Sequence, residues 1–316
     1  MTTARISQNH LKLSGVARMQ DKDSGSSNTK RLTIKDIMMM KHKLQKISVL
    51  TAYDYSTASI CDRAGVDILL VGDSAGMVML GYPTTNQINM EEMLIFCGAV
   101  SRGAKRAMII ADMPFGSYQA SISEAIANAI KFIKVGCHAV KLEGGIEIID
   151  SIKAIINTGI PVMGHIGLKP QTTNLWEGYS LQGKTKISGL KLIEDAKALE
   201  EAGAFSIVLE MVTSEVADII RKNVSIPTIG IGSGLSCDGQ VLVLHDLLGI
   251  YQDIKPKFVK RYAELSRSIF DAVSVYINDV KSSKFPEEGN VFHICSSDLE
   301  ELSKMLKEKK IIKKWT

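Results

Sequence analysis

The sequence predicts a (β/α)8 TIM barrel, and its length and repeating pattern lead there first. The chain has 316 residues, enough for two ordinary domains or for one barrel of about 250 residues with tails. Short aliphatic runs recur along it, each followed by a polar residue and separated from the next by a helical stretch. Runs buried on both faces that alternate with helices are typical of parallel β/α units. Because the repeat continues without a linker from Lys46 to roughly Tyr276, one closed barrel is favoured over two sheets.

The two ends of the chain lie outside this repeat. Residues 1–31 are predicted to be a flexible tail, and Met1–Gln20 contains arginine and lysine but no acidic residue. Organelle transit peptides share that composition, and a plain unstructured tail explains it equally well, so a mitochondrial and a cytoplasmic location both stay open. The catalytic barrel is predicted over residues 32–292. Residues 293–316 are predicted to form a helical extension with a lysine-rich end.

Seven aliphatic runs are predicted strands, and an eighth run is a weaker candidate. In chain order they are Ile47–Ala52, Ile68–Val71, Ala107–Asp112, Ala139–Glu143, Ile160–His165, Phe205–Glu210, Thr228–Gly232 and Val241–Leu244. An open doubly wound sheet would need a glycine-rich phosphate turn directly after an early strand. No such turn follows the early runs, which again favours the barrel.

Five helices are predicted between these strands: Glu91–Arg102, Ser121–Lys134, Ile146–Ile156, Ser188–Glu201 and Ser214–Lys222. Serine side chains accept hydrogen bonds from the free amides of a first helical turn, so Ser188 and Ser214 are expected to be N-caps. Glycine commonly follows the last helical residue, and Gly159 and Gly203 occupy such positions.

Composition excludes several classes of protein. With 45% hydrophobic and 23% charged residues, the chain can build a globular core and is not a disordered polyelectrolyte. The 38 Lys+Arg and 34 Asp+Glu leave a net charge of +4, and scattered basic residues do not favour nucleic-acid binding. No apolar run approaches the ~20 residues of a membrane span. The five cysteines lie far apart, which favours reduced thiols over a disulfide framework or a zinc ribbon.

Polar residues at the ends of the predicted strands indicate an active site. In a barrel the carboxyl ends of the strands converge on the mouth where catalysis occurs. Those ends carry Asp73, Asp112, Glu143, His165 and Glu210. Each could by itself be a helix cap or a solvated loop residue, but four acids at four strand ends are harder to dismiss. Carboxylates suit a hard divalent cation such as Mg²⁺, which takes one or two of them and completes its shell with water and substrate.

Neighbouring positions sharpen this expectation. Asp73 and Asp112 follow adjacent strands and would repel each other unless a cation or a proton lay between them. Lys141 precedes Glu143 by two residues, so both point to the same side of their strand. Lys141 could neutralise the acids or hold a substrate carboxylate, and both interpretations stay open. His165 is expected to be a hydrogen-bonded neighbour with no direct role.

A glycine-rich segment, Gly230–Gly234, follows the seventh predicted strand. Barrels frequently bind phosphate at this place through backbone amides. Glycines are needed equally for a tight turn, and no basic residue adjoins the segment to balance a phosphate. The phosphate interpretation is therefore the weaker of the two.

An ordered series of motifs runs from about Lys46 to Phe292. The motifs are Thr51–Asp54, Val71–Ser74 with Gly76–Met77, Ala111–Phe115, Val140–Gly145, Gly164–Leu168 with Pro170–Gln171, Leu209–Glu210 and Asp238–Asp246. Each motif alone is weakly specific, whereas the series in this order is highly specific. This series resembles the family of ketopantoate hydroxymethyltransferase.

The resemblance implies a TIM barrel of the phosphoenolpyruvate/pyruvate type. It also implies an enzyme that transfers a hydroxymethyl group from methylene-tetrahydrofolate to 3-methyl-2-oxobutanoate (α-ketoisovalerate). The product would be 2-dehydropantoate (ketopantoate), in the biosynthesis of pantothenate and coenzyme A. A metal-stabilised enolate of the keto acid would be the nucleophile. The resemblance also implies a homo-oligomer, often a decamer. No residue of the folate pocket can be identified from the sequence.

The resemblance further implies roles for individual residues. The motif positions of Asp73 and Asp112 bind Mg²⁺, and Glu143 completes the metal site directly or through water. Asp73, Ser74, Asp112 and Lys141 hold the keto acid, and Glu210 is the catalytic base that removes its proton.

The chain departs from the usual family pattern at Thr84–Gln87, Ala75, Glu177 and Ser233. These positions could alter loop closure or substrate contacts. None of them is a proposed metal ligand, the lysine or the base, so activity is expected to survive.

Two other functions are consistent with a barrel of this kind. A lyase or mutase acting on another keto acid would work without folate, and it would normally carry an active-site loop with a cysteine, which this sequence lacks. A non-catalytic paralogue would be expected to have lost its catalytic set, whereas Asp73, Asp112, Lys141, Glu143 and Glu210 are all present.

Overall fold

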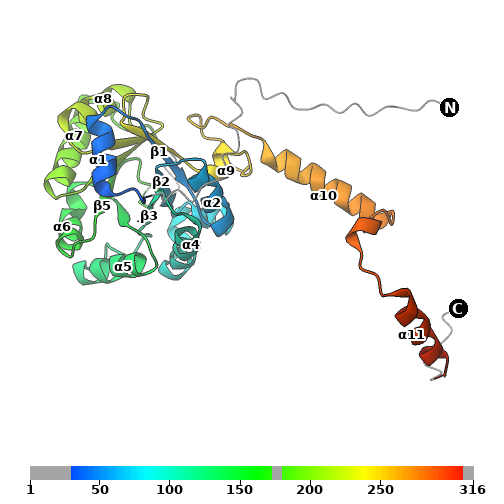
Figure 1. The fold of residues 1–316 in the computed structure, drawn as a ribbon. Helices are drawn as coiled ribbons and strands as arrows, with labels where there is room; N and C mark the ends of the chain where they lie inside the picture. Colours follow the sequence, from blue (N-terminus) through cyan, green and yellow to red (C-terminus); the bar gives the residue numbers. More distant parts are fainter. Residues whose placement is uncertain (1–29, 173–179, 309–316) are drawn as a thin grey trace, which may run out of the picture.

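The computed structural model describes residues 30–172 and 180–308 (Figure 1). The predicted tail of residues 1–31 lies almost wholly outside the described residues, and so does Glu177. The choice between a mitochondrial and a cytoplasmic location therefore stays a prediction, as do the predicted domain boundaries. In the described part of the chain, no helix combines the length and the apolar composition that a membrane crossing requires.

Eight parallel strands close into one barrel, which confirms the predicted fold class. Neighbours in the sequence are neighbours in the sheet, and β8 pairs with β1 to close the ring. The strands are β1 (Ile47–Thr51), β2 (Ile68–Val71), β3 (Met108–Asp112), β4 (Ala139–Glu143), β5 (Val162–Gly167), β6 (Ser206–Glu210), β7 (Thr228–Ile231) and β8 (Gly239–Leu242).

Helices follow each of the first six strands and form an outer layer around the barrel (Figure 1). They are α2 (Tyr55–Arg63), α3 (Ala75–Val78) with α4 (Met90–Gly103), α5 (Ile122–Lys134), α6 (Ile149–Asn157), α7 (Lys186–Glu201) and α8 (Ser214–Asn223). Three short 3₁₀ helices lie at Thr85–Gln87, Ile146–Ile148 and Glu288–Asn290.

The strands bury side chains on two sides, because successive residues of a strand point to opposite faces. Inward-pointing residues such as Val49, Ile110 and Met163 form one apolar cluster inside the barrel. Ile37 of α1 (Ile34–His42) belongs to the same cluster and is fully buried. Outward-pointing residues such as Leu69 form a second cluster beneath the helices. The inner cluster therefore gives the barrel a packed core.

The structure corrects three details of the sequence-based prediction. The eighth strand begins two residues earlier than predicted, because Gly239 to Leu242 pair in register with Ile47 to Leu50 of β1. The N-cap of α7 is Thr185, with Ser188 in its first turn as the other half of a capping box. The residue before α8 is Thr213, so Ser214 begins that helix and does not cap it. Gly159 and Gly203 do follow helix ends, with φ of 87° and 97°.

The glycine-rich segment after β7 makes a turn, as its alternative interpretation predicted. Gly232 and Gly234 have φ of 67° and 82°, which is strained for any residue with a Cβ. Between them, the buried Ser233 hydroxyl donates to the Leu209 carbonyl and accepts from the Val212 amide. Ser233 thus ties this turn to the end of β6.

The chain after β8 leaves the barrel. A short helix, α9 (Leu244–Leu247), is followed by an irregular segment and then by α10 (Leu265–Lys281), which extends away from the barrel (Figure 1). Beyond it lies α11 (Ser296–Glu308), where a helical extension was predicted. Neither α10 nor α11 has a buried residue.

Candidate active site

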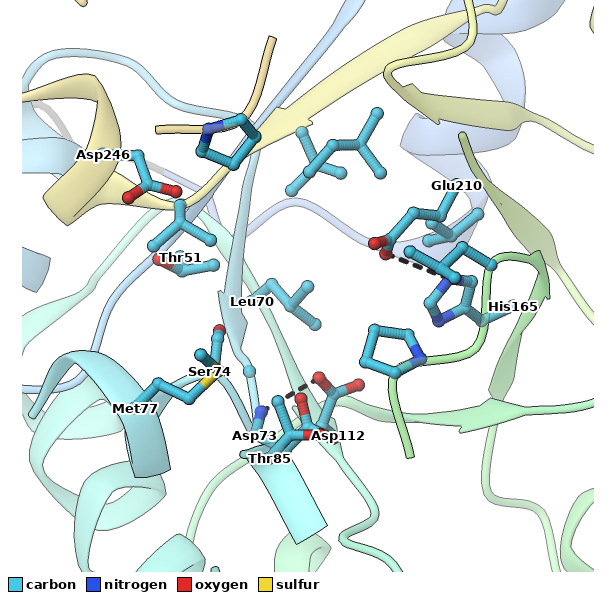
Figure 2. A pocket seen from close by; sticks show the side chains of 18 of the residues that line it. Thr51, Leu70, Asp73, Ser74, Met77, Thr85, Asp112, His165, Glu210 and Asp246 are labelled. Atoms are coloured by element: carbon cyan, nitrogen blue, oxygen red, sulfur yellow. Dashed lines mark hydrogen bonds and ion pairs between the residues drawn. The ribbon is translucent and has the colours of Figure 1, made fainter. Parts of the chain in front are cut away.

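A cavity of about 380 Å³ opens at the carboxyl ends of the strands, where the barrel fold predicts the active site. Asp73, Asp112, Lys141, Glu143, His165 and Glu210 all line it. Figure 2 shows Asp73 and Asp112 together at one side of the cavity, with Glu210 and His165 at another. The alternation of the strands explains this grouping, because Asp112, Lys141, Glu143, His165 and Glu210 all occupy inward-pointing positions near strand ends.

A buried ion pair joins two neighbouring strands. Asp112 and Lys141 are direct partners in the register of β3 and β4, and Lys141 Nζ lies 2.7 Å from Asp112 Oδ1. Burial lowers the pKa of Lys141, but Asp112 and the other nearby acids outweigh burial and raise it above its ordinary value. Lys141 is therefore a fixed ammonium beside the acids.

Asp73 follows β2 and lies against the same pair. Its backbone amide donates to Asp112 Oδ2 at 3.1 Å, and its Oδ2 accepts from Gln171 Nε2 at 2.8 Å. Burial raises the pKa of Asp73 well above its ordinary value, and the charges of Asp112 and Glu143 add to that effect. The buried carboxylates of Asp73 and Asp112 therefore repel each other, as their sequence positions predicted.

Glu143 is the third buried acid. Its Oε2 accepts from the backbone amide of Gln171 at 3.0 Å. Its Oε1 lies 4.0 Å from Lys141 Nζ and 3.4 Å from His165 Nδ1. Burial raises the pKa of Glu143, but His165, Lys141 and the Gln171 amide outweigh burial and lower it below its ordinary value. We refer to Asp73, Asp112 and Glu143 as the acidic cluster.

His165 lies between the acidic cluster and Glu210. Its Nδ1 is 3.0 Å from Lys141 Nζ, and its Nε2 is 3.3 Å from Glu210 Oε2. The Lys141 ammonium favours an unprotonated Nδ1, whereas Glu143 favours a protonated one. Burial and Lys141 lower the pKa of His165, but the two glutamates outweigh them and raise it to about 9. His165 is thus a hydrogen-bonded neighbour, as expected, and it orients Glu210.

A hydroxyl group borders the cavity near Asp73, and a buried tyrosine lies behind it. Ser74 lines it, and its hydroxyl lies 2.8 Å from the Tyr53 hydroxyl. Tyr53 is buried, and its burial raises its pKa above the ordinary value. Tyr53 therefore stays a neutral phenol that holds the Ser74 hydroxyl in place.

The acidic cluster fits a divalent cation. With Lys141 protonated and all three acids ionised, these four groups carry −3 + 1 = −2 charges. Asp112 Oδ1 is buried without a hydrogen bond and has only the ion pair with Lys141. In residues 30–172 and 180–308, no three His, Cys, Asp or Glu side chains are placed to form a complete metal site. Mg²⁺ needs only one or two carboxylates, since water and substrate supply its other ligands.

Sequence reasoning missed two buried residues that organise the cluster. Gln171 donates to Asp73 through its side-chain amide and to Glu143 through its backbone amide, and its Oε1 accepts from the Tyr118 hydroxyl at 2.8 Å. Tyr118 also accepts from the Glu143 amide at 3.2 Å. Gln171 stands in a motif that resembled the family, but neither residue is charged or at a strand end, so chemistry alone did not single them out.

Comparison with known proteins identifies the family. The family model of ketopantoate hydroxymethyltransferase matches residues 31–288. The chain belongs to this family. It is 59% identical to the 3-methyl-2-oxobutanoate hydroxymethyltransferase of Nitrosopumilus maritimus over 273 residues, which cover 86% of this chain and 97% of that protein. It is 54% identical to the same enzyme of Clostridium botulinum (strain Langeland), over 84% of this chain and 96% of the relative. The chain is therefore an enzyme of the hydroxymethyltransferase type.

Solved structures show a similar fold at low sequence identity. A phosphonopyruvate hydrolase in complex with oxalate and Mg²⁺ has a TM-score of 0.53 and 12% identity, covering 88% of this chain and 97% of its own. A phosphoenolpyruvate phosphomutase from Streptomyces platensis subsp. rosaceus has a TM-score of 0.53 and 13% identity, covering 87% and 99%. These similarities support the barrel architecture.

Proposed function

We propose that this enzyme transfers a hydroxymethyl group from methylene-tetrahydrofolate to 3-methyl-2-oxobutanoate and forms 2-dehydropantoate for pantothenate biosynthesis. The names of its relatives support the ketopantoate-forming activity. One geometric observation carries the chemistry: a buried Lys141 within an acidic cluster shares a cavity with Glu210, which lies apart from it on β6.

The acidic cluster and its neighbours would bind the keto acid. Lys141 and Ser74 offer an ammonium and a hydroxyl to the oxygens of the substrate. Asp73 and Asp112, with Glu143, would hold Mg²⁺. Bound there, Mg²⁺ would supply the positive charge that stabilises electron density developing on the keto oxygen.

The inner apolar residues would hold the branched end of the substrate. Leu70, Val208 and Val241 point into the barrel and line the cavity. A branched aliphatic group resting on them would bring the adjacent C–H bond toward Glu210. This wall also keeps water away from the carbon that loses its proton.

Glu210 is proposed as the base. Its side chain is 17% exposed, and its Oε2 lies beside His165 Nε2. Glu210 removes the proton from the carbon next to the keto group, and the electron pair of that C–H bond remains on the substrate as an enolate. The enolate carbon then forms a C–C bond to the one-carbon unit, both C–N bonds that held this unit to the folate break, and water supplies the new hydroxyl. The two folate nitrogens take up the proton held by Glu210 and the remaining proton of the water.

Other residues that line the cavity are proposed to hold the folate. Met77, Tyr251 and Phe258 line it, and their side chains provide apolar and aromatic area for a flat ring system. Asp246 also lines the cavity (Figure 2), and burial raises the pKa of its carboxyl above the ordinary value. Its oxygens could accept hydrogen bonds from the ring N–H groups of the folate.

Proton exchange tests the base assignment. With Mg²⁺ and no folate, the enzyme is expected to exchange the C3 proton of 3-methyl-2-oxobutanoate in deuterated water, as followed by NMR. Glu210→Gln should abolish this exchange while keeping Mg²⁺ binding, measured by calorimetry. Unchanged exchange in Glu210→Gln would refute the assignment. Formation of 2-dehydropantoate on adding methylene-tetrahydrofolate separates a transferase from a lyase.

The family resemblance also leads us to propose a homo-oligomer.

A further inference from the structure

The segment that follows α9 contributes to the mouth of the active-site cavity. Its side chains that line the cavity are Tyr251, Ile254, Pro256, Lys257 and Phe258. Lys257 is the charged one of these five, and its side chain is also exposed to solvent. A side chain that both lines a cavity and meets solvent lies at the rim. The proposed reaction gives this lysine no role.

A tight turn holds Lys257 in this position. The Val259 amide donates to the Pro256 carbonyl at 3.1 Å, which closes a turn with Lys257 and Phe258 at its centre. Phe258 packs against Gly232 of the turn after β7, where an added Cβ would lie 3.0 Å from its ring. The backbone that carries Lys257 is therefore anchored to the barrel.

The segment as a whole is basic. Residues 249–264 contain three lysines and one arginine against two acids, which gives a net charge of +4 − 2 = +2. Arg261 is paired with Glu264, 3.2 Å away. The Lys260 ammonium lies over the ring of Tyr262, 4.8 Å from its centroid. Two of the four basic groups therefore already have local partners.

Lys255 and Lys257 are the other two. In the described part of the chain, no carboxylate forms an ion pair with either ammonium. Lys141, deeper in the same cavity, is instead paired with Asp112 and is proposed to bind the keto acid. Lys257 therefore offers a second, unpaired positive charge, at the rim and apart from the keto-acid site.

The size of the cavity leaves one end of a folate outside it. Its volume of about 380 Å³ is near the lower end of the range for a single drug-sized ligand, and the keto acid occupies part of this space. The pterin end of the folate has to enter, because it carries the one-carbon unit to the enolate. The opposite end, a glutamate tail with free carboxylates, therefore extends past the rim.

We propose that Lys257, together with Lys255, binds the glutamate tail of methylene-tetrahydrofolate, so that the enzyme prefers folates with several γ-linked glutamates. The inference rests on the proposed function and adds a tail site to it. The two lysines are two residues apart, so both lie within the range of about 10 Å over which charges act at 0.1 M salt. Each added glutamate brings one more carboxylate into that range. An exposed ion pair of this kind changes affinity by up to about 5-fold.

Binding of two folates tests the tail site. Tetrahydrofolate lacks the one-carbon unit and cannot react, so its monoglutamate and triglutamate forms are titrated anaerobically into enzyme that holds Mg²⁺ and 3-methyl-2-oxobutanoate. By calorimetry at about 0.05 M salt, we expect the wild type to bind the triglutamate about 5-fold more tightly. This preference should shrink at about 0.5 M salt. Lys257→Gln should remove most of it, whereas Lys257→Arg keeps the charge and should retain it.

Lys260→Gln is the matched control. It removes one positive charge from the same segment, but from an ammonium that lies over Tyr262, and it should keep the wild-type preference. Circular dichroism checks that each variant is folded. Equal affinity of the wild type for both folates, or an unchanged preference in Lys257→Gln, would overturn the tail site and leave the proposed function standing. Loss of the preference in Lys260→Gln would assign it to net charge and also overturn the tail site. A wild type that binds neither folate would refute the proposed function and the tail site together.

Discussion

Gln171→Leu tests whether one amide side chain holds the acidic cluster together. Leucine keeps about the same volume and removes both polar groups. Gln171 Nε2 donates to Asp73 Oδ2 at 2.8 Å and to the Met113 carbonyl at 3.0 Å, and Oε1 accepts from Tyr118 at 2.8 Å. All of these bonds are buried. The substitution therefore leaves several buried groups without a partner.

The expected cost follows from these three bonds. A hydrogen bond to a charged group contributes about 1.5–3 kcal/mol and a neutral one about 1 kcal/mol. The sum predicts that Gln171→Leu lowers the free energy of unfolding by about 4 kcal/mol. Because Asp73 also loses the donor that orients it, the affinity for Mg²⁺ should fall by about 10-fold, the lower range for residues that support metal ligands.

Urea unfolding at one protein concentration measures the first quantity, and calorimetric titration with Mg²⁺ measures the second. Gln182→Leu is the matched control, since the Gln182 side chain donates to Ser180 through solvent-exposed hydrogen bonds. Gln182→Leu should change the free energy of unfolding by no more than about 0.5 kcal/mol. If Gln171→Leu changed the free energy of unfolding no more than the control does, the side-chain amide of Gln171 would not be what holds the acidic cluster in place.

Three further predictions follow from single contacts. Lys141→Met should lower the free energy of unfolding by about 3–5 kcal/mol in urea titrations, because it leaves Asp112 buried without its ion pair; an unchanged midpoint would contradict the buried pair. Gly167→Ala should lower the melting temperature and disturb Glu210, because residue 167 has a φ of 98° and an added Cβ would overlap the Glu210 carbonyl. Gly159→Ala is the control, since φ is 87° there but an added Cβ would meet open space. It should lower the free energy of unfolding by only about 1 kcal/mol. Burial raises the pKa of Asp238, but the Thr228 amide, Arg221 and Lys41 outweigh burial and lower that pKa below its ordinary value of about 3.9. The ionised carboxylate therefore stabilises the fold at pH values above about 3.9. In urea titrations, the free energy of unfolding of the wild type should exceed that of Asp238→Asn by an amount that shrinks as pH falls from about 5 to 2. A constant difference across that pH range would show that Asp238 does not titrate as described.

Much of the fold could be predicted because local patterns determine it. Aliphatic runs such as Ile68–Val71 are buried on both faces only in a parallel sheet covered by helices, so the runs indicated the barrel. The barrel in turn placed Asp73, Asp112, Glu143 and Glu210 at one mouth, because parallel strands end at the same rim. The sequence by itself therefore determined the fold class and the polar residues that line the cavity.

Other features depend on contacts between distant residues, which no local pattern encodes. Gln171 reaches Asp73 across 98 positions of the chain, and only the closed barrel brings the two together. The register of β8 was decided by its pairing with β1 and not by its own hydrophobic run. Helix α10 has no buried residue, which is likewise a property of tertiary packing. These features are determined by burial and by hydrogen bonds between residues far apart in the sequence, which only the folded chain brings together.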